Sequence, residues 1–264
     1  MCDKMLMMDN KAFDSKRIAE GYAQRPWLHK SVIETVKKDL GISEDFKFKN
    51  GLDVGCGAGL SSKALRLICD KVTGTDISDE MIKICKELYN DRYYTFYTAK
   101  AEETQIPKEK YDIVTAAGCI NWIDKDRFLR NIKAVTSNDA MIIIYDFGIT
   151  DRMCGNPGYT EWYKDEYLIG FPKPPRNEKK WSQTDLPSGF IMKKQADLEM
   201  EYEFDIDTFT DFMMIQSNVN SRIERGDISE KDVRAWLERT LGPVFDRRTR
   251  KPVFSGYIWY INRV

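Results

Sequence analysis

Three glycines at alternate positions follow a short apolar segment near residue 50. Gly55, Gly57 and Gly59 stand directly after a strand-like segment at 52–54, and a helical pattern begins at about residue 60. Glycine lets the backbone turn tightly and approach a ligand closely, and the start of a helix presents N–H groups to that ligand. The spacing therefore predicts a ligand-binding turn between a strand and a helix.

Two aspartates accompany this turn. Asp53 stands two residues before Gly55, and Asp76 ends the next strand-like segment, 17 residues after Gly59. A carboxylate at the tip of a second strand accepts hydrogen bonds from ribose hydroxyls, so we expect a nucleoside in the ligand. The NAD-binding pattern has the spacing GxGxxG and seats a pyrophosphate on the helix, whereas an acid beside the loop suits an ammonium group. Together these features favour S-adenosylmethionine.

The elements that must position these residues alternate regularly up to about residue 150. This rhythm of strands and helices predicts crossover units and a mainly parallel sheet covered on both faces. The predicted strands lie at 52–54, 71–76, 93–98, 112–117 and 140–147, and the predicted helices at 61–69, 78–89 and 126–135.

The pattern changes after residue 150. Glycine, proline, aromatic and charged residues dominate 151–190, which predicts an irregular insertion or lid. A strand-like alternation returns at 197–204, and a helical stretch follows at 207–241. The β-branched and aromatic run at 253–261 predicts a final strand.

Composition excludes several classes of protein. The chain has 264 residues, 41 Lys and Arg, 42 Asp and Glu and a formal charge of −1, which argues against nucleic acid or a membrane as the main partner. The single histidine, His29, excludes a multi-histidine metal site, and we expect no metal. The six cysteines form no CxxC pair, which predicts free thiols. The apolar runs are far shorter than the ~20 residues of a membrane span, and together these features predict a cytoplasmic protein.

Four segments carry a resemblance to class I S-adenosylmethionine-dependent methyltransferases: DVGCGAG at 53–59, GTDIS at 74–78, AKAEE at 99–103 and YDIVTAAGCINW at 111–122. The chain resembles the small-molecule branch that includes trans-aconitate and ubiquinone/menaquinone methyltransferases. Specific motifs cover about 15–147, and the rest matches more loosely. The resemblance implies an α/β fold with a Rossmann-like, doubly wound seven-stranded sheet, mostly parallel with an antiparallel last strand, plus an inserted lid and C-terminal helices.

The resemblance also implies a domain organisation. We expect one methyltransferase domain over 1–264, with a cofactor-binding core at 11–150 and the insertion or lid at 151–190. The late strands and helices at 191–264 would complete the sheet and the acceptor site.

The cofactor implied is S-adenosyl-L-methionine, with S-adenosyl-L-homocysteine as product. The glycine loop would face its methionine part, and Asp76 would hold the ribose. An arginine can grip the cofactor carboxylate with two hydrogen bonds. The implied cofactor-binding residues are Tyr22, Arg25, Asp53, Gly55, Cys56, Gly57, Gly59, Asp76, Ile77, Ala101, Glu102 and Ala117.

The acceptor side departs from the family pattern at one position. Many relatives carry His-Trp after the fourth strand, whereas this chain has Asn121 and Trp122. We expect O-methylation of a carboxylate or hydroxyl of a small molecule, with N-methylation as an alternative. A carboxylate is ionised at pH 7 and needs no base, whereas an amine or phenol would be helped by one. The candidate catalytic residues are His29, Asn121 and Asp146, and the further candidate bases are Tyr145 and Glu161.

Aromatic side chains predict the acceptor pocket, because aromatic walls exclude water and favour a flat or cationic guest. Core or lid packing is the alternative role for most of them. The predicted pocket residues are Trp122, Tyr145, Tyr159, Trp162, Tyr163 and Trp181.

Two other functions remain open at this point. A non-catalytic, S-adenosylmethionine-binding regulatory protein would share the same loop. An NAD-dependent oxidoreductase is disfavoured by the glycine spacing and by the lack of a Tyr-x-x-x-Lys or histidine-based arrangement for hydride transfer. The oligomeric state, monomer or homodimer, also remains open.

Overall fold

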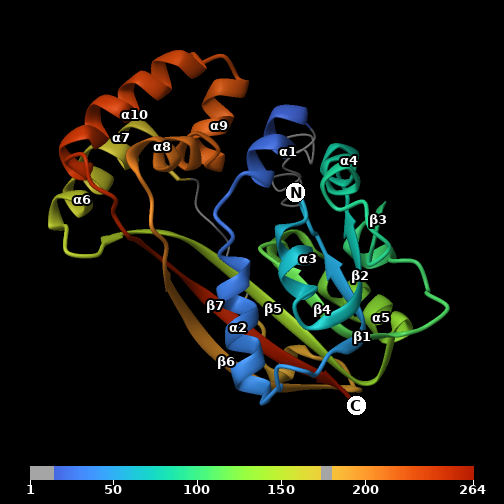
Figure 1. Cartoon of the computed structure of the whole chain (residues 1–264). Coiled ribbons are helices and arrows are strands. Elements are labelled where there is room, and N and C mark those ends of the chain that lie inside the picture. The colour runs from blue at the N-terminus through green and yellow to red at the C-terminus, as the bar shows by residue number, and fades with distance from the viewer. Residues whose placement is uncertain (1–14, 174–179) are drawn as a thin grey trace, which may run out of the picture. The chain divides into compact units, whose positions relative to one another are not determined.

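The structure is a computed structural model that describes residues 15–173 and 180–264. Helices and strands alternate through the first 150 residues, as predicted (Figure 1). The strands are β1 (Phe48–Val54), β2 (Cys69–Asp76), β3 (Tyr94–Thr98), β4 (Tyr111–Ala117), β5 (Thr136–Met153), β6 (Phe190–Glu201) and β7 (Pro252–Arg263). The α-helices are α1 (Lys16–Ala23), α2 (His29–Leu40), α3 (Leu60–Leu65), α4 (Asp79–Leu88), α5 (Lys125–Val135), α6 (Pro157–Glu161), α7 (Leu168–Gly170), α8 (Ile206–Met214), α9 (Ser217–Glu224) and α10 (Glu230–Phe245).

The seven strands form one sheet in the order β3-β2-β1-β4-β5-β7-β6. Strand β1 pairs in parallel with β2 and β4, and the pairs β2–β3 and β4–β5 are also parallel. The strand order therefore reverses beside β1, and ligands of doubly wound sheets bind at such a point, outside the carboxyl ends of the strands.

The last strand runs against its neighbour. Thr150 Oγ1 of β5 donates to the Val253 carbonyl of β7, and directly after β5 the Cys154 N–H donates to the Lys251 carbonyl, directly before β7. The residue number of the acceptor falls from 253 to 251 as that of the donor rises from 150 to 154, so β7 is antiparallel to β5. The predicted fold class is confirmed: a mostly parallel seven-stranded sheet with an antiparallel last strand.

The predicted elements differ from the observed ones mainly at their ends. Strand β1 begins at Phe48 and β5 continues to Met153, so both are longer than predicted. The predicted helix at 61–69 ends at Leu65, because β2 already begins at Cys69. Helix α4 begins after Ser78, whose side chain accepts the Met81 N–H as an amino-terminal cap.

The chain forms two compact units. Unit 1 holds the described residues up to Phe147, those at 180–198, and Gly256–Val264; unit 2 holds the described residues at 148–173 and Glu199–Ser255. The predicted core boundary at 150 lies close to the first of these divisions. The predicted insertion at 151–190 is not a unit by itself, because its early residues belong to unit 2 and its late residues to unit 1.

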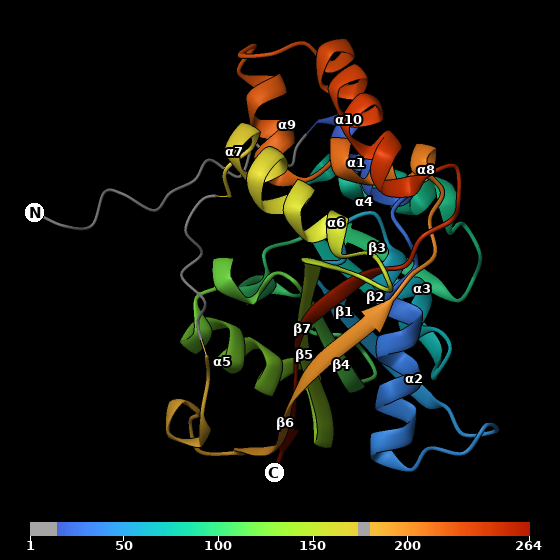
Figure 2. The same ribbon diagram turned by 90° about the vertical axis from the view of Figure 1, so that its left-hand side faces the viewer.

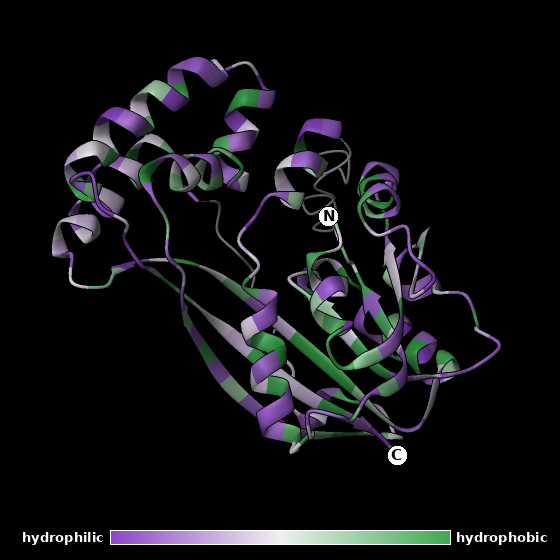
Figure 3. Cartoon of the chain, in the orientation of Figure 1, coloured by the Kyte–Doolittle hydropathy of each residue, from purple (hydrophilic) through white to green (hydrophobic). Residues whose placement is uncertain are grey.

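In unit 1, helices cover both faces of the sheet. Figure 2 shows α5 on one side of the strands and α2 and α3 on the other side. On the α5 side, Leu129 and Ile132 pack with strand residues such as Val114 and Ile142. Helix α2 carries both polar and apolar segments along its length (Figure 3), and its buried residues are Val32, Ile33 and Val36. The sheet is thus buried on both faces, as a parallel sheet requires.

In unit 2, the segment predicted to be irregular is largely helical. Its aromatic residues recur at 159, 162, 163 and 167, which places them on one helical face, and all four are buried. The Trp162 ring stacks on Tyr159 and Tyr167, with centroids 5.6 and 5.5 Å apart. A π-helical turn, Trp162–Tyr167, joins α6 to α7. Within 15–173 and 180–264, no helix is long and apolar enough to cross a membrane.

Candidate functional site

The glycine loop lies where β1 ends and α3 begins. All three glycines have positive φ: +65° at Gly55, +51° at Gly57 and +88° at Gly59. The loop is tied to the tip of β2, because the Gly57 N–H donates to Asp76 Oδ2 at 2.9 Å. The Ser78 N–H donates to Asp76 Oδ1 at 3.0 Å. The two motifs singled out in the sequence therefore meet in one site.

The loop is packed at its ends and open in the middle. A Cβ atom added at Gly55 would lie 2.7 Å from Cys119 Cβ, and one added at Gly59 would lie 2.5 Å from Tyr89 Cε2. A Cβ atom added at Gly57 would meet nothing within 4 Å. The backbone at Gly57 therefore faces space that a ligand can occupy, beside a carboxylate suited to ribose. The loop fits the cofactor that the sequence predicts.

Asp53 lies beneath the loop rather than at its surface. It is 0% exposed, and its carboxylate accepts three hydroxyl hydrogen bonds, from Ser61 Oγ and Ser62 Oγ at 2.6 Å and from Thr115 Oγ1 at 2.8 Å. Burial raises the pKa of Asp53 to about 6, although the three hydroxyl donors oppose the shift. The carboxylate joins β1, α3 and β4, so its contacts support the loop from below.

Two further predicted residues, Cys56 and Ala117, lie in or beside the loop, together with Cys119. Cys56 is buried and Cys119 half-buried, and burial raises the pKa of both thiols, so each acts as an apolar filler. The Cys119 Sγ donates to the Val54 carbonyl at 3.3 Å. Ala117 ends β4 and pairs with Tyr145 of β5. These contacts place β4 and β5 next to the loop.

Helix α1 lies against the glycine loop. Its residues Ile18 and Ala19 pack in one cluster with Ala58 of the loop and Met81 of α4, and Tyr22 borders this cluster. The Arg25 guanidinium lies 3.6 Å from the centroid of the Tyr22 ring. The structure thus places Tyr22 beside the loop and Arg25 beside Tyr22, and their role toward the cofactor stays a prediction.

His29 and Tyr145 form a hydrogen-bonded pair. His29 Nδ1 lies 2.9 Å from the Tyr145 hydroxyl oxygen, and the imidazole also contacts the Phe147 ring edge to face, with centroids 5.1 Å apart. Tyr145 is 1% exposed. Burial, and then the positive charge of Arg25, lower the pKa of His29 to about 3. The imidazole is therefore neutral at pH 7.

The remaining unit 1 candidates lie on short segments after the strands. Glu102 is in the 3-10 turn Ala101–Glu103, and its Oε1 accepts the Asp124 N–H at 2.8 Å. Ile77 is 44% exposed beside Asp76, which leaves it open to a ring. Asn121 and Trp122 lie in the turn Ile120–Trp122, and Trp122 is 55% exposed.

Asp146 lies in β5, where its Oδ1 accepts the Phe147 N–H at 2.8 Å, and its role toward an acceptor stays a prediction. Trp181 departs from its predicted place in an acceptor pocket. Trp181 is in the core of unit 1, with its ring 6.4 Å from Phe128 and 6.1 Å from Trp259. It is 4% exposed, so its contacts are those of a core residue and not of a lid.

The other predicted pocket residues, Tyr159, Trp162 and Tyr163, belong to unit 2. All three are buried in its aromatic cluster. Glu161, a predicted base, lies at the end of α6 in the same unit and is exposed. The structure therefore groups these four residues with one another, and their role toward an acceptor stays a prediction.

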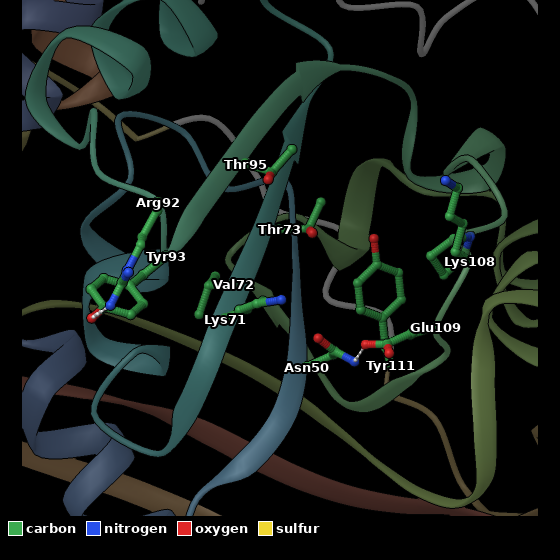
Figure 4. A pocket seen from close by; sticks show the side chains of 11 residues that line it. Asn50, Lys71, Val72, Thr73, Arg92, Tyr93, Thr95, Lys108, Glu109 and Tyr111 are labelled. Atoms are coloured by element: carbon green, nitrogen blue, oxygen red, sulfur yellow. Dashed lines mark hydrogen bonds between the residues drawn. The ribbon is translucent and has the colours of Figure 1, made fainter.

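A separate groove, of about 540 Å³, lies near the amino ends of the strands (Figure 4). Lys71 and Thr73 of β2, Thr95 of β3 and Tyr111 of β4 line it. Asp76 and Ala117 end their strands at the opposite edge, so the groove is distinct from the glycine-loop site.

Sequence reasoning missed two features of this site. One is the set of hydroxyls on Asp53; the pair Ser61-Ser62, directly after the glycine loop, is a local signal that could have found part of it. The other is the pairing of His29 with Tyr145 across 116 positions of sequence, for which there is no local signal.

Comparison with known proteins identifies the class. Residues 52–144 match the methyltransferase domain family. The chain is similar to malonyl-[acyl-carrier protein] O-methyltransferase 1 of Ilyobacter polytropus, with 27% identity over 45% of this chain and 47% of that protein. It is also similar to the ubiquinone/menaquinone biosynthesis C-methyltransferase of Vibrio vulnificus, with 30% identity over 36% of this chain and 40% of that protein. The chain thus spans less than half the length of these curated relatives.

A solved structure shares the fold. A candidate type II methyltransferase from Anaeromyxobacter dehalogenans superposes with a TM-score of 0.64 and 22% identity, over 87% of this chain and 95% of that one. The two chains share a Rossmann-like, doubly wound fold. Within this fold, residues 52–144 carry a methyltransferase domain of the class I, S-adenosylmethionine-dependent type.

Proposed function

We propose that this protein transfers a methyl group from S-adenosylmethionine to an oxygen atom of a small-molecule acceptor, a carboxylate or a hydroxyl. One observation carries the proposal: the open Gly57 backbone is hydrogen-bonded to Asp76, at the carboxyl ends of β1 and β2. The relatives support methyl transfer to oxygen or carbon, since their names describe an O-methyltransferase and a C-methyltransferase.

The chain's own residues would bind and orient the reactants. Asp76 would accept hydrogen bonds from the ribose, and Ile77 would cover the adenine. Tyr22 and Arg25 would close over the methionine part, where the guanidinium suits the carboxylate. When bound, S-adenosylmethionine supplies a methyl group on a positively charged sulfur, and this group is electrophilic without further activation.

Orientation and the exclusion of water would provide most of the catalysis. A carboxylate acceptor releases no proton, so no general base is required. His29 is neutral and its lowered pKa makes it a weak base at neutral pH, which favours this route. Asn121, Asp146 and the exposed Trp122 are the residues we propose to contact the acceptor.

A methyl-transfer screen tests this proposal. Purified protein is incubated with S-adenosylmethionine labelled on the methyl group and with matched sets of carboxylic acids, phenols, alcohols and amines. We expect labelled methyl ester or methyl ether as product. Label transfer only to amines or carbon would contradict the O-methylation proposal, and binding of S-adenosylmethionine without transfer to any set would favour the non-catalytic alternative.

A further inference from the structure

The hydrogen bond between His29 and Tyr145 fixes where the imidazole carries its proton. The Tyr145 side chain is 1% exposed, and His29 Nδ1 is the one acceptor of its hydroxyl among residues 15–173 and 180–264. If Nδ1 carried the proton instead, the phenol proton would be buried with no acceptor in the described part of the chain, which costs the desolvation free energy of that group. The tyrosine therefore donates, and Nδ1 accepts.

A neutral imidazole with an unprotonated Nδ1 carries its proton on Nε2. Burial and the nearby charge of Arg25 keep the ring neutral at pH 7. Nε2–H has no hydrogen-bond partner in the described ranges, and His29 is half-buried rather than closed off. His29 thus presents a donor, and not an acceptor, to a ligand.

The surroundings of this donor favour a negatively charged oxygen. Arg25 stands four residues before His29, and its guanidinium lies 3.6 Å from the centroid of the Tyr22 ring. Its positive charge contributes to the lowered pKa of His29. Tyr145 is also adjacent to the ligand edge of the sheet, because its carbonyl accepts the Gly118 N–H at 2.8 Å, directly after β4 ends. A hydrogen-bond donor and a cation together favour the binding of a carboxylate. They do not favour the removal of a proton from an acceptor.

We propose that His29, held as the Nε2–H tautomer by Tyr145, donates a hydrogen bond to a carboxylate bound at the carboxyl edge of the sheet. The inference rests on the proposed function and narrows it: His29 orients an ionised oxygen and is not the general base. Tyr145 is the positioning residue. The carboxylate belongs either to the methyl acceptor or to the methionine part of the cofactor, and the experiment separates these sources.

Because the chain contains one histidine, isotope-labelled histidine gives an unambiguous NMR signal. We expect an unprotonated Nδ1 and a protonated Nε2 that do not titrate between about pH 5 and pH 8. In Tyr145→Phe the two tautomers should mix. Tyr260→Phe is the matched control, since it removes another buried tyrosine hydroxyl, which donates to Asp39, and should leave the His29 signals unchanged. A protonated Nδ1, or a titration near pH 6.5, would overturn the proposal.

Ligand titrations then identify the source of the carboxylate. S-adenosylhomocysteine has a methionine-type carboxylate and 5′-methylthioadenosine lacks it, so a shift of the Nε2–H signal with the first alone assigns the cofactor. In protein saturated with S-adenosylhomocysteine, a further shift with benzoate and none with benzyl alcohol assigns the acceptor. No shift in either titration would overturn the carboxylate assignment.

Kinetics supply a second readout. With a carboxylate acceptor, His29→Leu removes the donor and should lower kcat/KM by roughly ten- to a hundredfold, the range of a hydrogen bond to a charged group. His29→Gln keeps an N–H donor and should recover part of this loss. An unchanged kcat/KM in His29→Leu would count against the proposal. Calorimetry measures S-adenosylhomocysteine binding independently of the His29 signals. Failure of cofactor binding would contradict the proposed function, and the NMR spectrum would still report the tautomer of His29.

Discussion

At the scale of single residues, two titratable groups, the half-buried His29 and the buried Asp53, respond to pH in opposite directions. The folded state disfavours the charged form of both His29 and Asp53, because burial removes water from each. For histidine the charged form is the protonated one, and for aspartate it is the deprotonated one. Acidification therefore opposes folding through His29 and favours it through Asp53.

The histidine effect can be isolated by substitution. Below pH 6.5 the unfolded chain binds a proton on His29 that the folded chain does not bind until about pH 3, so its contribution to stability is lost as pH falls. In His29→Asn this loss should be absent. Between about pH 7.5 and pH 5, we expect the wild type to lose about 2 kcal/mol more unfolding free energy than the variant. Urea unfolding at both pH values measures this, and equal losses would be inconsistent with the neutral, buried imidazole.

Asp53 should behave in the opposite way. Its pKa is about 6 in the folded protein and 3.8 as the ordinary value, so the folded state binds the additional proton and stability falls as pH rises through this interval. Replacing Asp53 by Asn removes the titration. Relative to the wild type, Asp53→Asn should gain about 2 kcal/mol in unfolding free energy between about pH 4 and pH 7. Asp70→Asn, on the exposed end of β2, is the control and should show no such gain.

The sequence indicated contacts best where the signal was local. Gly55, Gly57 and Asp76 lie within one strand–helix–strand segment, and in the structure the Gly57 N–H donates to Asp76. The burial of Asp53 and the partner of His29 depend on Thr115 and Tyr145, which lie on strands far along the chain. Such contacts follow from strand order, which a single sequence specifies weakly.

At the scale of elements, a comparison of two glycines distinguishes the effect of backbone strain from the effect on ligand binding. Gly57 and Gly41 share positive φ, +51° and +63°, and an added Cβ atom at either position would meet nothing within 4 Å. Gly41 ends α2, away from the loop. The two positions therefore form a matched pair.

Substitution of each glycine by alanine should have the same folding cost and different binding effects. We expect Gly57→Ala and Gly41→Ala each to lose about 1 kcal/mol of stability, the cost of a left-handed backbone for alanine. Only Gly57→Ala places a methyl group in the proposed cofactor space, so it alone should weaken S-adenosylhomocysteine binding, by at least roughly tenfold. Thermal unfolding and calorimetry measure the two effects. Equal affinities in the two variants would mean that the loop does not contact the cofactor.

Element prediction succeeded for the alternating strands and helices of the first 150 residues and was wrong for much of 151–190. Glycine and proline there suggested irregular structure, while the spacing of Tyr159, Trp162, Tyr163 and Tyr167 follows a helical face. Aromatic residues lower helix propensity but bury large areas, and in unit 2 this burial outweighs propensity.

At the scale of the whole molecule, the fold class was predictable and most of the division into units was not. The alternation of strands and helices implies crossover connections, and these join parallel strands. The change in composition after residue 150 lies close to the first division, within β5. The divisions within β6 and β7 interrupt continuous strands, and no linker marks them. The methyltransferase domain match at 52–144 lies entirely in unit 1.

The central claim is that the glycine loop and Asp76 bind S-adenosylmethionine, and calorimetric titration with S-adenosylhomocysteine tests it most directly. We predict one binding site per chain and no binding of NAD. Asp76→Asn should lose at least roughly tenfold in affinity, because a ribose hydrogen bond to a charged group is removed. The control Asp70→Asn should lose none. Thermal unfolding verifies that each variant is folded. Absence of S-adenosylhomocysteine binding in the wild type, or equal affinity in folded Asp76→Asn, would contradict the account.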